Sequence, residues 1–332
     1  MTALIEVSNL TIRFRTDEGL VTAVEDVSFT LGKGEVMGLV GESGSGKSVT
    51  AKALMSLNAR NAVYGEDSRI TLHADTGPVE VLKLKTAREL KIVRGGAISI
   101  IFQEPMASFA PAITIGRQMV EQLQLHGDMS KARAKEISVE MLDRVGISDP
   151  ARRFDQYAFE LSGGMRQRAM IAMALSTRPK LLIADEPTTA LDVTIQAQVI
   201  DLMKDLVNEF HMGIVFITHD LGVIAQTADK VSVMYLGRLI EEGPVREVIR
   251  NPKHPYTRGL IAALPKLDDL DAPLTPVAGD IPSPLERPAG CVFHTRCPKI
   301  LGEVCRTALP GDTQVNPTHR VACHLYPPGG PA

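Results

Sequence analysis

Hydrophobic positions in the first 250 residues fall into short apolar runs separated by longer amphipathic stretches. A continuous apolar run fits a buried strand, and a stretch with apolar residues three or four apart fits a helix. Their alternation predicts an α/β layered domain with a largely parallel, buried sheet. The predicted strand and helix pairs are EVMGLV with KSVTAKALMSL, AISIIFQ with TIGRQMVEQLQLH, KLLIADE with TIQAQVIDLMKDLVNEF, and GIVFITHD with LGVIAQTAD.

The N-terminal segments follow a different pattern. IEVSNLTIRF and AVEDVSFTL alternate apolar and polar residues with period two, which predicts a half-exposed antiparallel sheet. Residues 69–81, RITLHADTGPVEV, predict a hairpin with a Thr-Gly-Pro turn.

The last 80 or so residues differ in composition. Residues 251–332 hold 14 of the 21 prolines, and short polar pieces alternate with Pro and Gly from about Leu264 onward. All four cysteines of the chain also lie here. We predict a separate, loop-rich unit.

Composition limits the classes of protein that the chain can represent. With 332 residues, 44% of them hydrophobic, the chain can bury a large domain and a smaller one. A net charge of -3 provides no basic field for nucleic acid. The N-terminus lacks a signal-peptide pattern, and no window approaches the roughly 18 apolar residues of a membrane span. We therefore expect a soluble, cytosolic chain, in which clustered cysteines indicate metal or redox chemistry before disulfides.

The segment GESGSGKS, Gly41 to Ser48, fits the phosphate-loop pattern G-x-x-x-x-G-K-[ST] between a predicted strand and a predicted helix. Glycines let backbone N–H groups converge on phosphate oxygens, and the helix N-terminus favours negative charge. Lys47 is expected to reach the β- and γ-phosphates, and the Ser48 hydroxyl to bind Mg²⁺. The predicted nucleotide contacts in the loop are Gly41, Ser43, Gly44, Ser45, Gly46, Lys47 and Ser48.

An apolar strand, KLLIADE, ends in two carboxylates. A buried parallel strand delivers such groups to the carboxyl edge of the sheet, where ligands bind. We expect Asp185 to hold Mg²⁺, directly or through water, and Glu186 to orient and deprotonate the attacking water. The alternative is a surface acid pair, and the matching phosphate loop favours the functional interpretation.

Four further motifs complete a set that resembles the ABC-type ATPases. LSGGMRQR resembles their signature sequence, IIFQEP with Gln103 their Q-loop, TALD (189–192) their D-loop, and ITHD with His219 their switch histidine. All six motifs occur in the family's order. The tail, with NPKHPYTRGLIAALP and the cysteines, resembles the C-terminal extension of ATPase subunits of dipeptide and oligopeptide importers.

The resemblance implies an ABC-type P-loop ATPase fold with a parallel core sheet, an antiparallel β subdomain and a helical subdomain. The implied domains are a nucleotide-binding domain over residues 1–250, with its helical subdomain at about 104–178, and a C-terminal extension over residues 251–332.

The signature has its own physical reading. A serine followed by two glycines before a helix makes a second anion-binding N-terminus, but the chain has only one phosphate loop. By the resemblance, Ser162, Gly163 and Gly164 of one subunit close over the γ-phosphate held by another, so that hydrolysis requires a dimer.

The remaining site residues take their roles from the resemblance. His219 is expected near the γ-phosphate, and Gln103 couples metal and water to the membrane subunits. Asp192 crosses the dimer interface or caps the helix that follows it. Phe14 stacks on the adenine or simply faces the core.

The cysteine spacing, C-x5-C-x7-C-x17-C, contains no C-x2-C pair and leaves the ligand undecided by itself. The resemblance implies a [4Fe-4S] cluster held by Cys291, Cys297, Cys305 and Cys323. Interleaved histidines, His294, His319 and His324, keep a Zn²⁺ site with mixed ligands open, and unligated thiols are the third alternative. A structural or regulatory role follows, with redox sensing as a hypothesis.

The resemblance implies the ATP-hydrolysing subunit of a peptide importer at the cytoplasmic face of the inner membrane. The partners that it implies are a paralogous ATPase subunit, two transmembrane permease subunits and an extracytoplasmic substrate-binding protein. The net charge predicts no nucleic-acid partner. Glutathione, a nickel chelate or an oligosaccharide are the alternative cargoes. A soluble ABC ATPase acting on DNA or ribosomes, or a non-hydrolysing regulatory cassette, are the rival functions.

Overall fold

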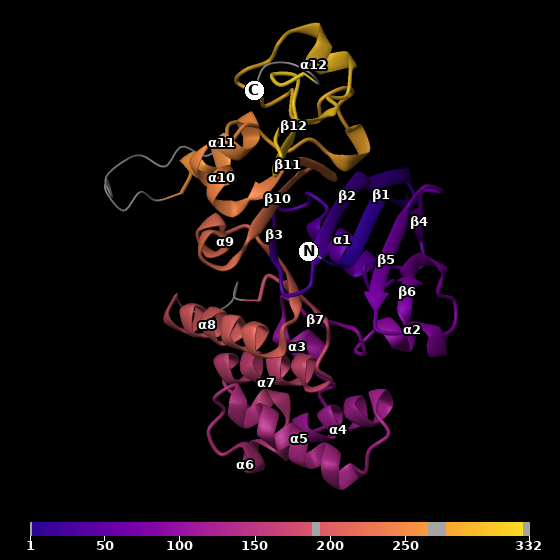
Figure 1. Cartoon of the computed structure of the whole chain (residues 1–332), viewed down its shortest axis with the longest axis vertical. Coiled ribbons are helices and arrows are strands. Elements are labelled where there is room, and N and C mark those ends of the chain that lie inside the picture. The colour runs from indigo at the N-terminus through magenta and orange to yellow at the C-terminus, as the bar shows by residue number, and fades with distance from the viewer. Residues whose placement is uncertain (1, 188–192, 265–276, 328–332) are drawn as a thin grey trace. The chain divides into compact units, whose positions relative to one another are not determined.

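The computed structural model describes residues 2–187, 193–264 and 277–327 (Figure 1). They form two compact units, each assembled from segments that are distant in the sequence. We call residues 1–5, 31–35 and 71–216 the helical unit. Residues 6–30, 36–70 and 217–332 are called the phosphate-loop unit.

Buried strands form the centre of the helical unit. β7 (Ile98–Ile101) and β8 (Leu181–Asp185) pair in parallel, and β8 has β9 (Gly213–Thr218) as its other neighbour. Every residue of β8 is buried, which explains the apolar run that precedes Asp185. The predicted alternation of buried parallel strands with helices is therefore present.

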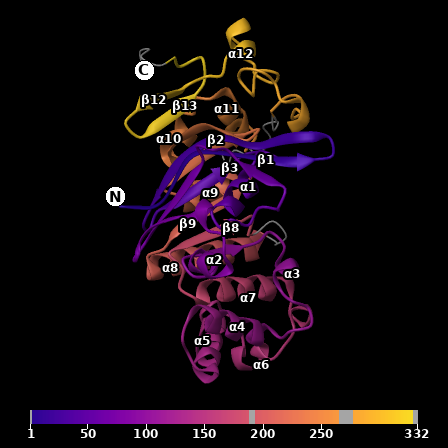
Figure 2. The same ribbon diagram turned by 90° about the vertical axis from the view of Figure 1, so that its right-hand side faces the viewer.

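Helices make up most of this unit. α4 (Ile115–His126) buries one face, with Ile115, Met119 and Leu123 four residues apart. The side chain of Ser130 caps α5 (Lys131–Arg144) by accepting a hydrogen bond from the Arg133 N–H at 3.2 Å. α4, α5, α6 (Pro150–Phe154) and α7 (Gly163–Ser176) pack against one another (Figure 1 and Figure 2). The other helical elements are η1 (Val81–Lys83), α2 (Ala87–Val93), α3 (Pro105–Ser108), η2 (Ala158–Glu160) and α8 (Val193–Phe210).

The predicted hairpin is present, but its turn was placed wrongly. β5 (Arg69–Ala74) and β6 (Gly77–Glu80) pair in antiparallel fashion, and Ala74 pairs with Gly77. The two turn residues are therefore Asp75 and Thr76, while Gly77 and Pro78 already belong to the second strand. Asp75 in the turn forms an ion pair with Lys180, a distant contact that no local sequence pattern indicates.

An antiparallel sheet opens the phosphate-loop unit. β1 (Ala3–Thr16) lies next to β2 (Gly19–Gly32), and Ile12 of β1 pairs with Tyr64 of β4 (Ala62–Tyr64). Leu10 and Ile12 are fully buried, as the period-two pattern predicts. Within the described residues, no helix is both long enough and apolar enough to cross a bilayer.

The strand that precedes the phosphate loop belongs to a mixed sheet in the same unit. β3 (Val36–Val40) pairs in parallel with β10 (Lys230–Tyr235), which pairs antiparallel with β11 (Arg238–Pro244). The tail adds β13 (His319–Ala322) to β11 and then β12 (Asp312–Asn316), so it is not made of loops alone (Figure 1). The unit also contains α1 (Lys47–Ala53), α9 (Leu221–Thr227), α10 (Val245–Arg250), α11 (Pro255–Ala262), η3 (Pro284–Glu286) and α12 (Glu303–Thr307).

Candidate nucleotide-binding site

The phosphate loop connects β3 to α1 and depends on its glycines. Gly41 has a φ of 153°, and a Cβ on it would lie 2.2 Å from the Met234 carbonyl oxygen. Gly46 has a φ of 98°, and a Cβ there would lie 2.7 Å from the Ala23 carbonyl oxygen. Side chains at either position would collide with backbone, so the close approach of neighbouring strands explains both glycines.

Lys47 points back into the loop. Its Nζ donates hydrogen bonds to the carbonyl oxygens of Gly41 at 2.7 Å and Glu42 at 2.9 Å, and the residue is only 6% exposed. Ser45 is buried, and its carbonyl oxygen accepts a hydrogen bond from the Gly237 N–H at 2.9 Å. The ammonium group is thus held at the centre of the loop. The predicted contacts Ser43 and Gly44 are exposed on the loop, and Ser48 is half-buried.

A second group of predicted residues lies in the helical unit, at the ends of two parallel strands. Asp185 ends β8 and is 6% exposed. Glu186 follows with a φ of 47°, a left-handed conformation that is uncommon for a residue with a Cβ and recurs at functional sites. The Gln103 Nε2 donates a hydrogen bond to the Glu186 carboxylate at 2.9 Å. The structure therefore brings together two of the residues predicted to handle the attacking water.

The signature segment begins a helix in the same unit. Ser162 is the N-cap of α7, and its Oγ accepts a hydrogen bond from the Met165 N–H at 3.4 Å. Ser162 and Gly163 are exposed, and a Cβ on Gly163 would meet nothing within 4 Å. Gly164 is half-buried, and a Cβ on it would lie 3.4 Å from Ile195. This helix start is open to an incoming group.

Gln167, one turn further along α7, was missed by sequence reasoning. It is 2% exposed, and its Nε2 donates a hydrogen bond to the carbonyl oxygen of Pro187 at 2.5 Å. The bond ties the signature helix to the residue that follows Glu186. A polar amide on the same helix face as the buried Met170, Ile171 and Ala174 is the signal that could have identified it.

The other predicted residues are placed as follows. His219 is exposed directly after β9 and belongs to the phosphate-loop unit. Phe14 is half-buried on β1 and pairs with Ala62 of β4. Asp192 and the rest of the predicted D-loop lie outside the described residues. The roles of all these residues stay predictions.

The four cysteines gather in the phosphate-loop unit as free thiols. Burial and the neighbouring thiols Cys297 and Cys305 raise the pKa of Cys291. The pKa of Cys323 is raised to about 11, first by burial and then by the other three thiols. Backbone N–H groups of Lys299 and Leu301 donate to the Sγ atoms of Cys297 and Cys305, each at 3.4 Å. The thiols therefore lie close enough to repel one another when ionised.

The interleaved histidines have other partners. Ring nitrogens of His294 and His324 are hydrogen bonded to the carbonyl oxygens of Cys291 and Ala308, and that of His319 to the Glu241 carboxylate. Among the described residues, no group of three or more His, Cys, Asp or Glu side chains is arranged to hold a metal ion. The structure thus gives no support to the predicted [4Fe-4S] cluster or to the mixed-ligand zinc alternative.

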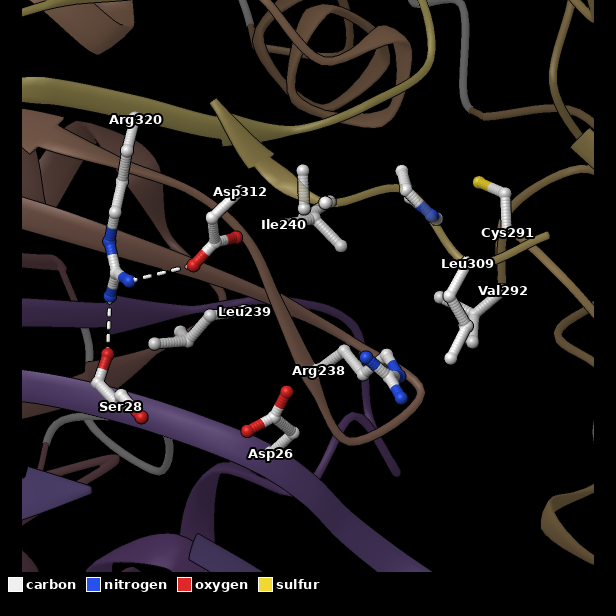
Figure 3. Close-up of a pocket in the computed structure, with 13 residues that line it drawn as sticks. Asp26, Ser28, Arg238, Leu239, Ile240, Cys291, Val292, Leu309, Asp312 and Arg320 are labelled. Carbon is white, nitrogen blue, oxygen red and sulfur yellow. Dashed lines mark hydrogen bonds and ion pairs between the residues drawn. The ribbon is translucent and has the colours of Figure 1, made fainter. Parts of the chain in front are cut away.

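A small cavity of about 220 Å³ has Cys291 in its lining (Figure 3). Cys291 and Val292 lie on one side of it and Asp26 and Arg238 on another. Arg320 donates a hydrogen bond to Asp312 at 3.0 Å across its wall. Arg238 donates a hydrogen bond to Glu25 at 2.9 Å, and Arg320 also donates to the Ser28 carbonyl oxygen.

Two families match the sequence. The ABC transporter family matches residues 24–189, which include the phosphate loop, Gln103, the signature and both carboxylates of the strand end. The C-terminal region of the oligopeptide/dipeptide transporters matches residues 240–305, from β11 through the third cysteine.

Individual relatives extend over most of the chain. The oligopeptide transport ATP-binding protein OppD of Salmonella typhimurium is 52% identical over 307 residues, covering 92% of this chain and 89% of OppD. A Brucella melitensis protein, provisionally named a peptide import ATP-binding protein, is 47% identical and covers 96% of both chains. The solved dimeric structure of MJ0796, a bacterial ABC transporter cassette, is 26% identical with a TM-score of 0.63, covering 73% of this chain and 99% of that one.

The fold and the phosphate loop define an ATP-binding cassette, which confirms the predicted fold class and the predicted ATPase activity. The chain belongs to the ABC transporter family, and its tail matches that family's oligopeptide/dipeptide branch.

Proposed function

We propose that the chain is the ATP-hydrolysing subunit of an importer that carries peptides across the cytoplasmic membrane. The observation that carries the proposal is the match of residues 240–305 to the oligopeptide/dipeptide C-terminal region, together with relatives named for oligopeptide transport and peptide import. Glutathione, nickel chelates and oligosaccharides are not favoured by these names.

The binding step rests on the phosphate loop. The Lys47 ammonium group, which donates hydrogen bonds to the carbonyl oxygens of Gly41 and Glu42 and to the Ser45 hydroxyl, would exchange these partners for the β- and γ-phosphates when nucleotide binds. Ser48 would supply a hydroxyl oxygen to Mg²⁺. Asp185, which is buried at the end of β8, and Gln103 are the other predicted oxygen donors. Bound Mg²⁺ would supply positive charge against that developing on the phosphates.

The hydrolytic step rests on Glu186. Its carboxylate is the base that orients and deprotonates the attacking water, and the Gln103 amide fixes the orientation of that carboxylate through the 2.9 Å hydrogen bond. His219 is proposed to contact the γ-phosphate, and Phe14 to stack on the adenine. An intact base argues against a regulatory cassette that binds nucleotide without hydrolysis.

The assembly is proposed to be a dimer of cassettes on two transmembrane permease subunits, at the cytoplasmic face of the inner membrane. Ser162, Gly163 and Gly164 would act on nucleotide held by the partner cassette, which we propose is a paralogous ATPase subunit. The exposed start of α7 supports this role, because its Ser162 and Gly163 are accessible. An extracytoplasmic binding protein would deliver the peptide.

We also propose that the four cysteines ligate a [4Fe-4S] cluster. The proposal is motivated by four neighbouring thiols, two of which accept backbone N–H groups. Because the described residues form no arrangement able to hold a metal ion, it otherwise rests on the resemblance of the tail. Iron and acid-labile sulfide should be lost together in Cys291→Ser and Cys305→Ser.

Cargo-dependent ATP hydrolysis tests the proposed function. The transporter should be assembled with its permease subunits, partner ATPase and binding protein in proteoliposomes. Peptides of two to five residues are expected to stimulate hydrolysis several-fold, while glutathione, a nickel chelate and an oligosaccharide leave the basal rate unchanged. Stimulation by one of those three compounds and not by peptides would overturn the assignment of cargo.

A further inference from the structure

Glu42, the second residue of the phosphate loop, is held by side chains of the C-terminal extension. Its carboxylate accepts two hydrogen bonds from the Arg296 guanidinium, one at 2.7 Å and the other at 3.1 Å. The arginine side chain is 3% exposed and that of the glutamate 26%. A bidentate pair between arginine and carboxylate fixes orientation as well as distance, and burial protects it from screening by salt.

A second residue of the extension holds the backbone of the same loop position. The Glu42 N–H donates a hydrogen bond at 2.9 Å to the hydroxyl oxygen of Tyr256, which is fully buried on α11. The Glu42 carbonyl oxygen accepts the 2.9 Å bond from Lys47. Glu42 therefore joins the phosphate-binding lysine to two side chains of the extension.

Arg296 is itself anchored on several sides. Its Nε and one terminal nitrogen donate to the carbonyl oxygens of Ala278 and Val277, at 3.0 and 3.1 Å. The guanidinium lies over the ring of Tyr235, 5.7 Å from its centroid, and over that of Phe293 at 6.0 Å. The hydrogen bonds to Glu42 raise the pKa of Arg296, which keeps it charged. Because these contacts already fix the Arg296 side chain, it loses little further conformational freedom when it binds Glu42.

We infer that Arg296 is a positioning residue for ATP binding, which acts through Glu42 to hold the phosphate loop in the conformation that presents Lys47. Loss of the pair frees the Glu42 side chain and loosens the carbonyl oxygen that orients the ammonium group. The affinity for MgATP then falls, while the hydrolytic residues in the helical unit are untouched. Arg296 immediately precedes Cys297, so the segment that binds the phosphate loop also carries one of the four cysteines.

The experiment compares Arg296→Gln with a matched control in the assembled transporter. The control, Arg320→Gln, also removes an arginine of the C-terminal extension. The charged partners of Arg320 are Asp312 and Glu242 of β11, and neither belongs to the phosphate loop. The expected result for Arg296→Gln is a rise of about tenfold in the KM for ATP with kcat within twofold of wild type. Arg320→Gln should leave the KM unchanged. The melting temperature is measured for both variants.

Three further variants separate positioning from folding. Glu42→Gln removes the same ion pair from a half-exposed side chain without a change of volume, and should raise the KM by a similar factor. The double variant Glu42→Gln with Arg296→Gln should have a KM for ATP no higher than that of either single variant, because each single substitution already removes the same interaction. Arg296→Lys keeps the positive charge but not the bidentate guanidinium. It should therefore recover part of the affinity for ATP that Arg296→Gln loses.

An unchanged KM for ATP in both Arg296→Gln and Glu42→Gln would overturn the inference. An increase that also appears in Arg320→Gln at the same loss of melting temperature would assign Arg296 a purely structural role. The KM is read on ATP hydrolysis whichever cargo stimulates it, so failure of the peptide assignment leaves this test intact.

Discussion

The phosphate loop and the end of β8 hold their functional side chains in different ways. Glu42 in the loop has its carboxylate, N–H and carbonyl oxygen all engaged, and two of the three partners lie more than 200 residues away. Glu186 at the strand end has a strained backbone and a hydrogen bond to the exposed Gln103. A rigid loop favours tight binding of nucleotide, and a base oriented by a neighbouring amide favours hydrolysis. Binding and hydrolysis should thus respond to different substitutions.

The largest expected effect is at the strand end. Glu186→Gln replaces the carboxylate base with an amide of the same shape, so kcat should fall by about 10²- to 10⁴-fold. The KM for ATP should change little, because the phosphate loop is unaltered. Hydrolysis is measured in proteoliposomes and binding with a fluorescent ATP analogue. A variant that hydrolyses ATP as fast as wild type would favour the regulatory, non-hydrolysing cassette.

A change of pH tests the stability of the C-terminal extension near Tyr256, whose hydroxyl accepts the hydrogen bond from the Glu42 N–H. His254 is fully buried and caps α11 by accepting a hydrogen bond from the Tyr256 N–H at 3.0 Å. Burial lowers the pKa of His254 to about 4, with the nearby Glu241 partly opposing the shift. The folded protein therefore disfavours the protonated ring, so its contribution to stability is complete above about pH 6.5 and is lost as the pH falls towards 4.

The expected loss is about 3 kcal/mol of unfolding free energy between pH 7 and pH 4. The control is His254→Asn, which can still cap the helix but does not titrate in this range. Urea unfolding at several pH values measures both proteins. If the two lose the same stability on acidification, His254 is not responsible for the pH dependence.

A smaller effect concerns the shape of the loop itself. Gly41→Ala places a Cβ 2.2 Å from a backbone oxygen, and should cost about 1 to 3 kcal/mol of stability and weaken nucleotide binding. Gly34→Ala is the matched control, because Gly34 also has a positive φ, of 70°, but nothing within 4 Å of an added Cβ. Thermal melting and nucleotide titration should show a milder loss of stability and unchanged binding for Gly34→Ala. Equal behaviour of the two variants would contradict the packing explanation.

Local patterns were sufficient for the fold class and for much of the candidate site. The spacing in Gly41–Ser48 identifies a phosphate loop because its chemistry is confined to eight consecutive residues. The apolar strand before Asp185 and Glu186 identifies the sheet edge because burial on both faces removes alternation. The proximity of Gln103 and Glu186 follows from the parallel pairing of β7 and β8.

The contacts that escaped prediction are those between distant segments. Glu42 is an unassigned position of the loop motif, and nothing near it in the sequence indicates Arg296 or Tyr256. Gln167 is hidden by the neighbouring signature motif. The strands β12 and β13 were missed because the proline content of the tail favours loops, whereas pairing with β11 outweighs that preference.

The most direct test measures KM and kcat for ATP on Arg296→Gln and Glu186→Gln in one preparation of the assembled transporter. The account predicts that Arg296→Gln raises the KM about tenfold at nearly constant kcat, and that Glu186→Gln lowers kcat at least about 100-fold at nearly constant KM. If both substitutions change KM and kcat together by similar factors, nucleotide binding and hydrolysis do not depend on separate groups of residues, and the account is wrong.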